Sequence, residues 1–346
     1  MGEREDFGRR QAEMTARWMS NLVAQGGDHG AHIEARKRAY MDRWREAARF
    51  VPDGARILDV GGGNLWPGLI RFFKDRGFDY WYMDVDPDSV ASSAAVARDL
   101  GFDGTKFVTG FNDQFPYDDA SFDAVFSSHC LEHSFDLAMT FAGLWRILKP
   151  GGALLMAVPF GWEANPEHPY FLGPSEWCVL VEDAGFEIRV AQVGREYPES
   201  GYDYFIAARK TAGPIGGQRL DPADYRKTHM SFLAFDDDQV RCESVLAVAE
   251  DHLICDGDWS MAVAVPPGAR VAMPILANHP WSAIVELGLG GENRLVDLHS
   301  WFSFVKPERL VSGAPGQAEG RVTIRPAGRN LLSRGNQCAF FGLLYR

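Results

Sequence analysis

Three features are scarce or missing in this sequence of 346 residues, and each argues against a class of protein. No run approaches the roughly 18 consecutive apolar residues of a membrane span, and the N-terminal stretch is charged rather than apolar. The five cysteines are scattered and contain no C-x-x-C pair, which argues against a disulfide framework and a structural zinc site. We therefore predict a cytoplasmic protein without a membrane partner.

Basic charge is the third scarce feature. The formal net charge is −12, and residues 51–213 carry 24 Asp and Glu against 12 Lys and Arg. Proteins that bind RNA or DNA rely on a basic surface to contact the phosphates. We therefore predict that nucleic acid is not a partner.

What the sequence has instead is a central region in which strand-like and helix-like runs alternate, as in a parallel α/β sheet. The predicted strands are 56–60, 79–84, 105–108, 122–128, 153–158, 186–193 and 204–209, and the predicted helices are 66–76, 87–101, 135–148 and 174–184. Only a loop separates the last two strands. Because parallel neighbours need a long crossover, we predict that the final strand is antiparallel.

The regions on either side have a different texture. Residues 1–50 predict two helices, 5–24 and 31–50. The second is amphipathic and is interpreted either as a helix that packs against the first strand or as part of a substrate lid, with the glycine-containing break at 26–30 as its hinge. Residues 220–346 consist of short apolar runs broken by turn signals, which predicts an all-β sandwich or barrel, with residues 211–219 as a linker. We therefore predict three parts: 1–50, a central domain over 51–212, and a β-rich accessory domain over 220–346 that is a candidate for self-association.

The central domain opens with a strand, three glycines and a helix start, in the stretch ILDVGGGNLWPGLIR at 57–71. Glycines suit a turn where a ligand must approach the backbone, and two cofactor classes use such a turn. A dinucleotide site needs a third glycine where this chain has Trp66, which argues against a pyrophosphate. Asp84 ends the next strand, where a carboxylate can accept hydrogen bonds from both hydroxyls of a ribose.

Motifs later in the sequence distinguish between the two cofactor classes, because together they resemble one known family. The segments YMDVDP (82–87), FPYDDASFDAVFSSHCLEH (115–133), LWRILKPGGALLMAVP (144–159) and VEDAGFEI (181–188) follow the glycine turn in order. With it they resemble the class I S-adenosylmethionine-dependent methyltransferases that act on small molecules, over about residues 50–210. The resemblance implies a Rossmann-like sheet of seven strands with the last antiparallel, and S-adenosylmethionine as cofactor.

The resemblance also implies roles for individual residues. The backbone of Gly61, Gly62 and Gly63 would lie against the methionine part of the cofactor, and Asp59 would orient its amino group. Asp84 would hold the ribose. The implied adenine position carries Phe111 and Asn112 instead of the family's acid, and the cofactor-binding residues are completed by Val85 and Ser128.

Two histidines after the fourth predicted strand are candidates for the catalytic base. Strand ends face the ligand crevice of an open α/β sheet, so His129 is placed to reach a substrate, and His133 is a second candidate with a structural alternative. The segment HCLEH also matches the zinc pattern H-x-x-E-H. That pattern needs both histidines on one continuous helix and a third ligand, whereas His129 falls at a strand-to-helix turn, so we predict no metal. The alternative is a divalent ion held by His129 and a carboxylate, as in related quinone-precursor methyltransferases, but this chain lacks their acidic pair there.

The loop after the fifth predicted strand is long and rich in aromatic residues. In the family this loop contacts the acceptor, and the alternative is a packed surface loop. The candidate substrate residues are Phe160, Trp162, His168, Tyr170 and Phe171.

These observations favour an enzyme that transfers a methyl group to an oxygen or nitrogen of a small molecule, such as a sugar, a lipid precursor or a secondary metabolite. Two alternatives remain open. One is an NAD-dependent oxidoreductase that uses the same turn, and the other is a non-catalytic carbohydrate-binding protein with a degenerate methyltransferase scaffold.

Overall fold

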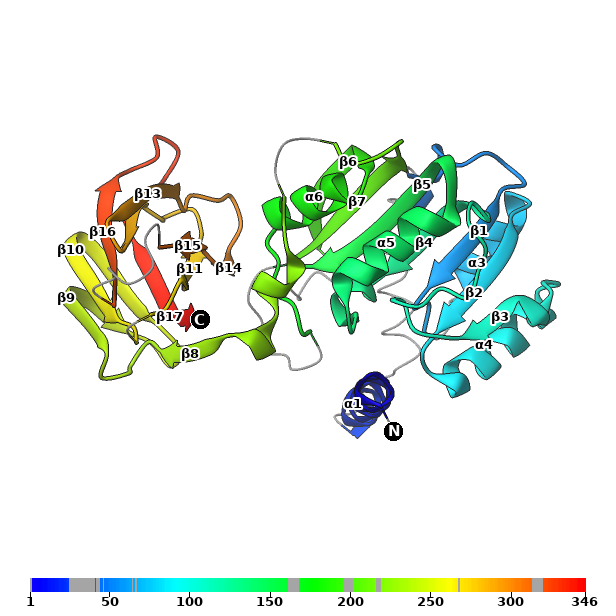
Figure 1. Cartoon of the computed structure of the whole chain (residues 1–346), viewed down its shortest axis with the longest axis horizontal. Helices are drawn as coiled ribbons and strands as arrows, with labels where there is room; N and C mark the ends of the chain where they lie inside the picture. The colour runs from blue at the N-terminus through cyan, green and yellow to red at the C-terminus, as the bar shows by residue number, and fades with distance from the viewer. Residues whose placement is uncertain are drawn as a thin grey trace. The chain divides into compact units, whose positions relative to one another are not determined.

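A computed structural model describes most of the chain, and Figure 1 shows its course. The described residues are 2–24, 41, 44–45, 47–63, 65, 67–160, 168–195, 202–215, 219–266, 268–312 and 320–346. The predicted hinge at 26–30, Trp66 and Trp162 lie outside them. The chain divides into two compact units, the first made of residues 1–160, 165–170 and 174–222, and the second of 161–164, 171–173 and 223–346.

The first unit is built on a sheet of seven strands in the order β3-β2-β1-β4-β5-β7-β6. These strands are β1 (Arg56–Val60), β2 (Asp79–Asp84), β3 (Phe107–Thr109), β4 (Phe122–Ser128), β5 (Leu148–Pro159), β6 (Phe186–Arg195) and β7 (Tyr202–Lys210). The first five pair in parallel, whereas β7 pairs antiparallel with both β5 and β6. The predicted Rossmann-like sheet with an antiparallel final strand is thus confirmed.

Helices connect these strands, and their ends follow from local sequence. They are α3 (Pro67–Asp75), α4 (Pro87–Asp99), α5 (Leu137–Ile147) and α6 (Pro174–Asp183), with α1 (Glu3–Ala24) before the sheet. Asp86 caps α4 by accepting the backbone N–H groups of Asp88 and Ser89, and Asp136 caps α5 at Met139. The short 3-10 turn η2 (Leu131–His133) joins β4 to α5 and carries the candidate base His133.

The core of the first unit explains why the sequences of its strands are mostly apolar without alternation. Four of the five residues of β1 are buried, as a parallel sheet covered on both faces requires. Trp44, from the predicted helix 31–50, is buried between the rings of Phe126 and Phe205, at centroid distances of 5.3 and 5.2 Å. The described end of that helix therefore packs against the sheet.

The second unit is all-β, as predicted. Its sheet runs in the order β13-β12-β16-β10-β17-β11-β14, and β8, β9 and β15 pair outside this path. The strands are β8 (Ser231–Ala234), β9 (Val240–Val248), β10 (Leu253–Ala264), β11 (Val271–Asn278), β12 (Ile284–Leu289), β13 (Glu292–Asp297), β14 (Phe304–Pro307), β15 (Leu310–Val311), β16 (Arg321–Gly328) and β17 (Cys338–Tyr345). All of these ladders are antiparallel.

One core cluster extends across this sheet from its edge strand β13 to β11, next to the other edge, and includes Val296 of β13, Leu276 of β11 and Phe340 of β17. The sheet therefore curls around its own core. The sequence did not predict β14 and β15, because FVKP and LV are too short to show an alternating pattern. Within the part of the chain that the structure describes, no helix combines the length and apolar character that a bilayer span requires.

Candidate active site

The glycine turn connects β1 to α3 at the carboxyl edge of the first sheet. Gly61 has φ +67° and donates its N–H to the carbonyl of Met83, at 2.8 Å. A methyl group on Gly61 would collide with Sγ and Cβ of Cys130, and one on Gly62 would lie 2.5 Å from the ring of Tyr82. These two glycines are therefore required by protein packing, before any ligand is considered.

Gly63 differs from its two neighbours. Its φ is +54°, and a methyl group there would meet no atom within 4 Å among the described residues apart from its own chain neighbours, so the turn opens at this residue. Its carbonyl accepts hydrogen bonds from the hydroxyls of Tyr82 (2.7 Å) and Ser93 (2.9 Å). The turn is thus held rigidly beside an open space.

Two carboxyl groups flank the turn, that of buried Asp59 and that of half-buried Asp84. Asp59, at 5% exposure, accepts a hydrogen bond of 2.9 Å from the hydroxyl of Tyr80. Asp84 at the end of β2 accepts the backbone N–H of Gly63 through Oδ2 and that of Asp86 through Oδ1, both at 3.0 Å. Burial raises the pKa of Asp84, while these two N–H groups act in the opposite direction.

The predicted adenine position lies under the N-terminal helix. A methyl group on Gly8 of α1 would lie 2.5 Å from the ring of Phe111 and 3.1 Å from Cγ2 of Val85, so α1 approaches both residues closely. The side-chain amide of Asn112 donates to the carbonyl of Cys130 at 3.3 Å and lies 3.4 Å from its Sγ. This contact ties the loop after β3 to the loop after β4.

The segment after β4 brings the two candidate bases to one carboxylate. Ser128 ends the strand, and His129 follows with φ +52°, a conformation that is uncommon for residues other than glycine. The Nδ1 atom of His129 lies 3.6 Å from Oε1 of Glu132, and the Nε2 atom of His133 lies 3.8 Å from the same oxygen. Glu132 is 2% exposed.

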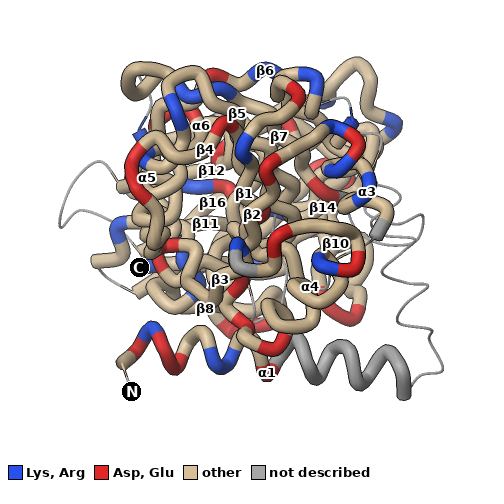
Figure 2. Tube along the Cα trace, turned by 90° about the vertical axis from the view of Figure 1, so that its right-hand side faces the viewer, with Lys and Arg blue, Asp and Glu red and all other residues tan. Residues whose placement is uncertain are grey.

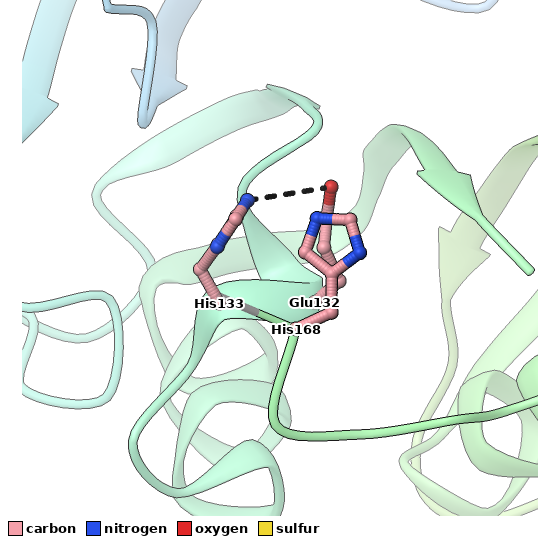
Figure 3. A group of neighbouring side chains, drawn as sticks. All are labelled: Glu132, His133 and His168. Atoms are coloured by element: carbon pink, nitrogen blue, oxygen red, sulfur yellow. Dashed lines mark ion pairs between the residues drawn. The ribbon is translucent and has the colours of Figure 1, made fainter. Parts of the chain in front are cut away.

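His168 joins this group from the loop after β5, as Figure 3 shows. Its ring stands 4.6 Å from that of His133, centroid to centroid. Glu132, His133 and His168 each offer one ligand atom, and these atoms lie within 4.8 Å of one another. Three residues able to hold a metal ion thus come together where the sequence led us to expect none.

The other predicted substrate residues lie elsewhere. Phe160 is buried with its ring 6.2 Å from that of Tyr204. The hydroxyl of Tyr170 accepts the backbone N–H of Leu137 at 3.1 Å, which anchors the start of α5. Phe171 belongs to the second unit and packs on Tyr225 at 5.9 Å.

Sequence reasoning missed the residues by which α1 reaches this region. Arg4 forms an ion pair of 3.0 Å with Asp113, whose side chain is fully buried, and stacks over the ring of Phe135. Gln11, one of the buried polar residues, contacts Nδ1 of His133 through Oε1 at 3.0 Å. Arg4, Gly8 and Gln11 recur at helical spacing, and a glycine inside a helical pattern was the available signal of a close contact.

Comparison with known proteins agrees with this architecture. Residues 58–156 match the family described as a methyltransferase domain. An uncharacterized methyltransferase of Mycobacterium sp. (strain KMS) is 30% identical over 139 residues, which make up 38% of this chain and 52% of that protein. The chain therefore spans about half the length of this relative.

Two further relatives carry more specific names. A 27-O-demethylrifamycin SV methyltransferase of Amycolatopsis mediterranei (strain S699) is 29% identical over 242 residues, 64% of this chain and 86% of that protein. A ubiquinone/menaquinone biosynthesis C-methyltransferase of Vibrio parahaemolyticus is 32% identical over 106 residues, 30% of this chain and 40% of that protein. Residues 58–156 thus belong to the methyltransferase domain family, and the unit that contains them has the seven-stranded sheet of the class I S-adenosylmethionine-dependent methyltransferases.

Proposed function

We propose that this protein transfers a methyl group from S-adenosylmethionine to an oxygen or nitrogen atom of a small molecule. The observation that carries the proposal is the position of the Asp84 carboxylate, which the backbone N–H of Gly63 holds beside the open space at that residue. A carboxylate oxygen has more than one acceptor position, so both oxygens of Asp84 can accept a ribose hydroxyl while keeping their backbone donors.

The other residues of the turn fit the same cofactor. Asp59 offers a buried carboxylate to a cationic amino group, and the absence of a phosphate in the cofactor agrees with the acidity of residues 51–213. Val85 and Phe111 offer an apolar surface to the adenine ring, under Gly8 of α1. When bound, S-adenosylmethionine supplies an electrophilic methyl group on a sulfonium ion.

The chain's own contribution to the reaction is alignment and proton removal. A hydroxyl acceptor must lose a proton as the new bond forms, and His129 is proposed to accept it. The Glu132 oxygen at 3.6 Å from Nδ1 of His129 would stabilise the resulting imidazolium ion. The name of the rifamycin relative, which aligns over 64% of this chain, favours oxygen as the acceptor atom.

Calorimetric titration with S-adenosylhomocysteine tests the cofactor assignment. Asp84→Ala should weaken binding about 10-fold to 100-fold, because a hydrogen bond to a charged group contributes about 1.5–3 kcal/mol. Asp88→Ala is the matched control, since Asp88 is exposed on the first turn of α4 and should leave the affinity unchanged. Binding that is indifferent to Asp84→Ala in a folded protein would refute the assignment.

A further inference from the structure

We propose that Glu132, His133 and His168 bind a divalent transition-metal ion of the zinc class. The donor set is two imidazoles and one carboxylate, which is a ligand set found in catalytic zinc sites. The three ligand atoms lie within 4.8 Å of one another. A tetrahedral ion with bonds of about 2.1 Å spaces its ligands about 3.4 Å apart, so binding would draw these side chains together by about 1 Å.

Gln11 of α1 orients one of the ligands. Its Oε1 atom lies 3.0 Å from Nδ1 of His133, and a carbonyl oxygen can only accept a hydrogen bond. Nδ1 of His133 therefore carries the proton in the neutral ring, and the lone pair is on Nε2, the nitrogen that faces Glu132 at 3.8 Å. A ligand histidine whose other nitrogen donates to an oxygen is the usual support of a metal site.

The burial of Glu132 adds a second, electrostatic reason. Its side chain is 2% exposed, and a carboxylate withdrawn from water is stabilised by a nearby positive charge or a metal ion. Three imidazoles surround this carboxylate: those of His129 and His133 from its own segment, and that of His168 from the loop after β5. A divalent cation held by His133 and His168 would place a positive charge beside this carboxylate.

The site differs from the zinc pattern that the sequence contains. H-x-x-E-H would pair His129 with His133, but His129 sits at a turn with φ +52°, and the third ligand comes from His168, 35 residues beyond His133. This juxtaposition depends on the pairing of β4 with β5, which brings their following loops to the same edge of the sheet. No spacing rule on the linear sequence could have revealed it.

Three protein ligands leave a fourth position for water or for an oxygen of the acceptor. Cys130, two residues before Glu132, packs against the glycine turn at Gly61, so the fourth ligand position lies on the same edge of the sheet as the proposed cofactor site. If the proposed methyl transfer holds, a bound hydroxyl would be acidified by the ion before His129 removes its proton. Metal binding itself does not depend on that transfer.

Zinc binding can be measured on the full-length chain without any cofactor. After removal of adventitious metal by a chelator, calorimetric titration with Zn²⁺ should show one bound ion, and Mg²⁺, which prefers oxygen ligands, should not compete. His168→Ala should lower the zinc affinity at least about 100-fold, and Gln11→Ala about 10-fold to 100-fold.

His252→Ala is the control, because His252 lies in the second unit and pairs with Asp251. It should leave the zinc affinity unchanged. Thermal unfolding without metal shows whether each variant is folded. If His168→Ala does not fold, Gln11→Ala still tests the site, because it keeps all three ligands. Absence of zinc binding by the wild-type chain, or equal affinity in a folded His168→Ala variant, would overturn the proposal, whereas failure to bind S-adenosylhomocysteine would leave it standing.

Discussion

At the scale of single residues, the three glycines of the turn have different reasons to be glycine. The sequence suggested that all three clear the way for a ligand. Side chains at Gly61 and Gly62 would instead meet Cys130 and Tyr82, and only Gly63 borders open space. The ligand would thus approach at Gly63, beside Asp84, and the other two glycines leave room for the side chains of Cys130 and Tyr82.

The raised pKa of Asp84 predicts how cofactor affinity depends on pH. Ribose hydroxyls donate to the ionised carboxylate, so affinity falls as the pH drops through the pKa of Asp84. Because burial raises this pKa above 3.8, the loss begins at a higher pH than for an ordinary aspartate. Titrations with S-adenosylhomocysteine at stepwise lower pH should show this decline. In Asp84→Asn, which cannot titrate, the decline should be absent, and an equal decline in that variant would assign it to another group.

At the scale of elements, α1 is joined to the carboxyl edge of the first sheet by charge, ring and amide contacts. Arg4 pairs with Asp113, Phe7 packs edge-on against Phe135 at 5.4 Å, and Gln11 contacts His133. Figure 2 shows that the described part of α1 carries both signs of charge along its length. Gly8 lies close to the proposed adenine position, which supports a lid role for α1, whereas Trp44 at the end of the predicted helix 31–50 packs in the core of the sheet.

Arg4→Ala should destabilise the first unit, because Asp113 would keep a buried carboxylate without its ion-pair partner. Burial already raises the pKa of Asp113, and an unsatisfied buried group costs about 1–3 kcal/mol. The melting temperature should fall by about 2–9 °C, measured by thermal unfolding. Arg9→Ala is the matched control, since the described partners of Arg9 are Asp6 and Glu13, solvent-accessible carboxylates of the same helix, and its loss should change little. If the two variants melt alike, the Arg4 contact does not hold α1 in place.

The lid proposal adds a second measurement on the same pair of variants. Loosening α1 should speed the dissociation of S-adenosylhomocysteine in Arg4→Ala but not in Arg9→Ala. Stopped-flow displacement would measure both rates, and identical rates would argue against a lid.

At the scale of the whole molecule, the net negative charge argues against nucleic acid as a binding partner. The net charge of −12 is concentrated in the central region, where acidic residues outnumber basic ones two to one. We expect no binding of a fluorescent single-stranded RNA at low salt, measured by anisotropy, because counterion release requires clustered basic residues. Binding that weakens steeply with added salt would contradict this prediction.

The second unit has a core of its own and stays without a proposed activity. Of the aromatic residues in its sequence, Trp259 is buried in that core, whereas Trp281 and Trp301 are exposed by 43% and 67%. Self-association through this unit remains a prediction from the sequence.

The sequence by itself determined the fold of the first unit and the turn at Gly61–Gly63, because hydrophobic periodicity, capping residues and glycine turns act locally and are legible in a linear chain. The sequence also identified Asp59 and Asp84 as candidate site residues, since the ends of strands can be predicted from the sequence. The tertiary structure alone decided which residues from separate segments meet: α1 on the loops after β3 and β4, and His168 beside His133 and Glu132. Such contacts depend on strand order and loop course, which no local pattern encodes.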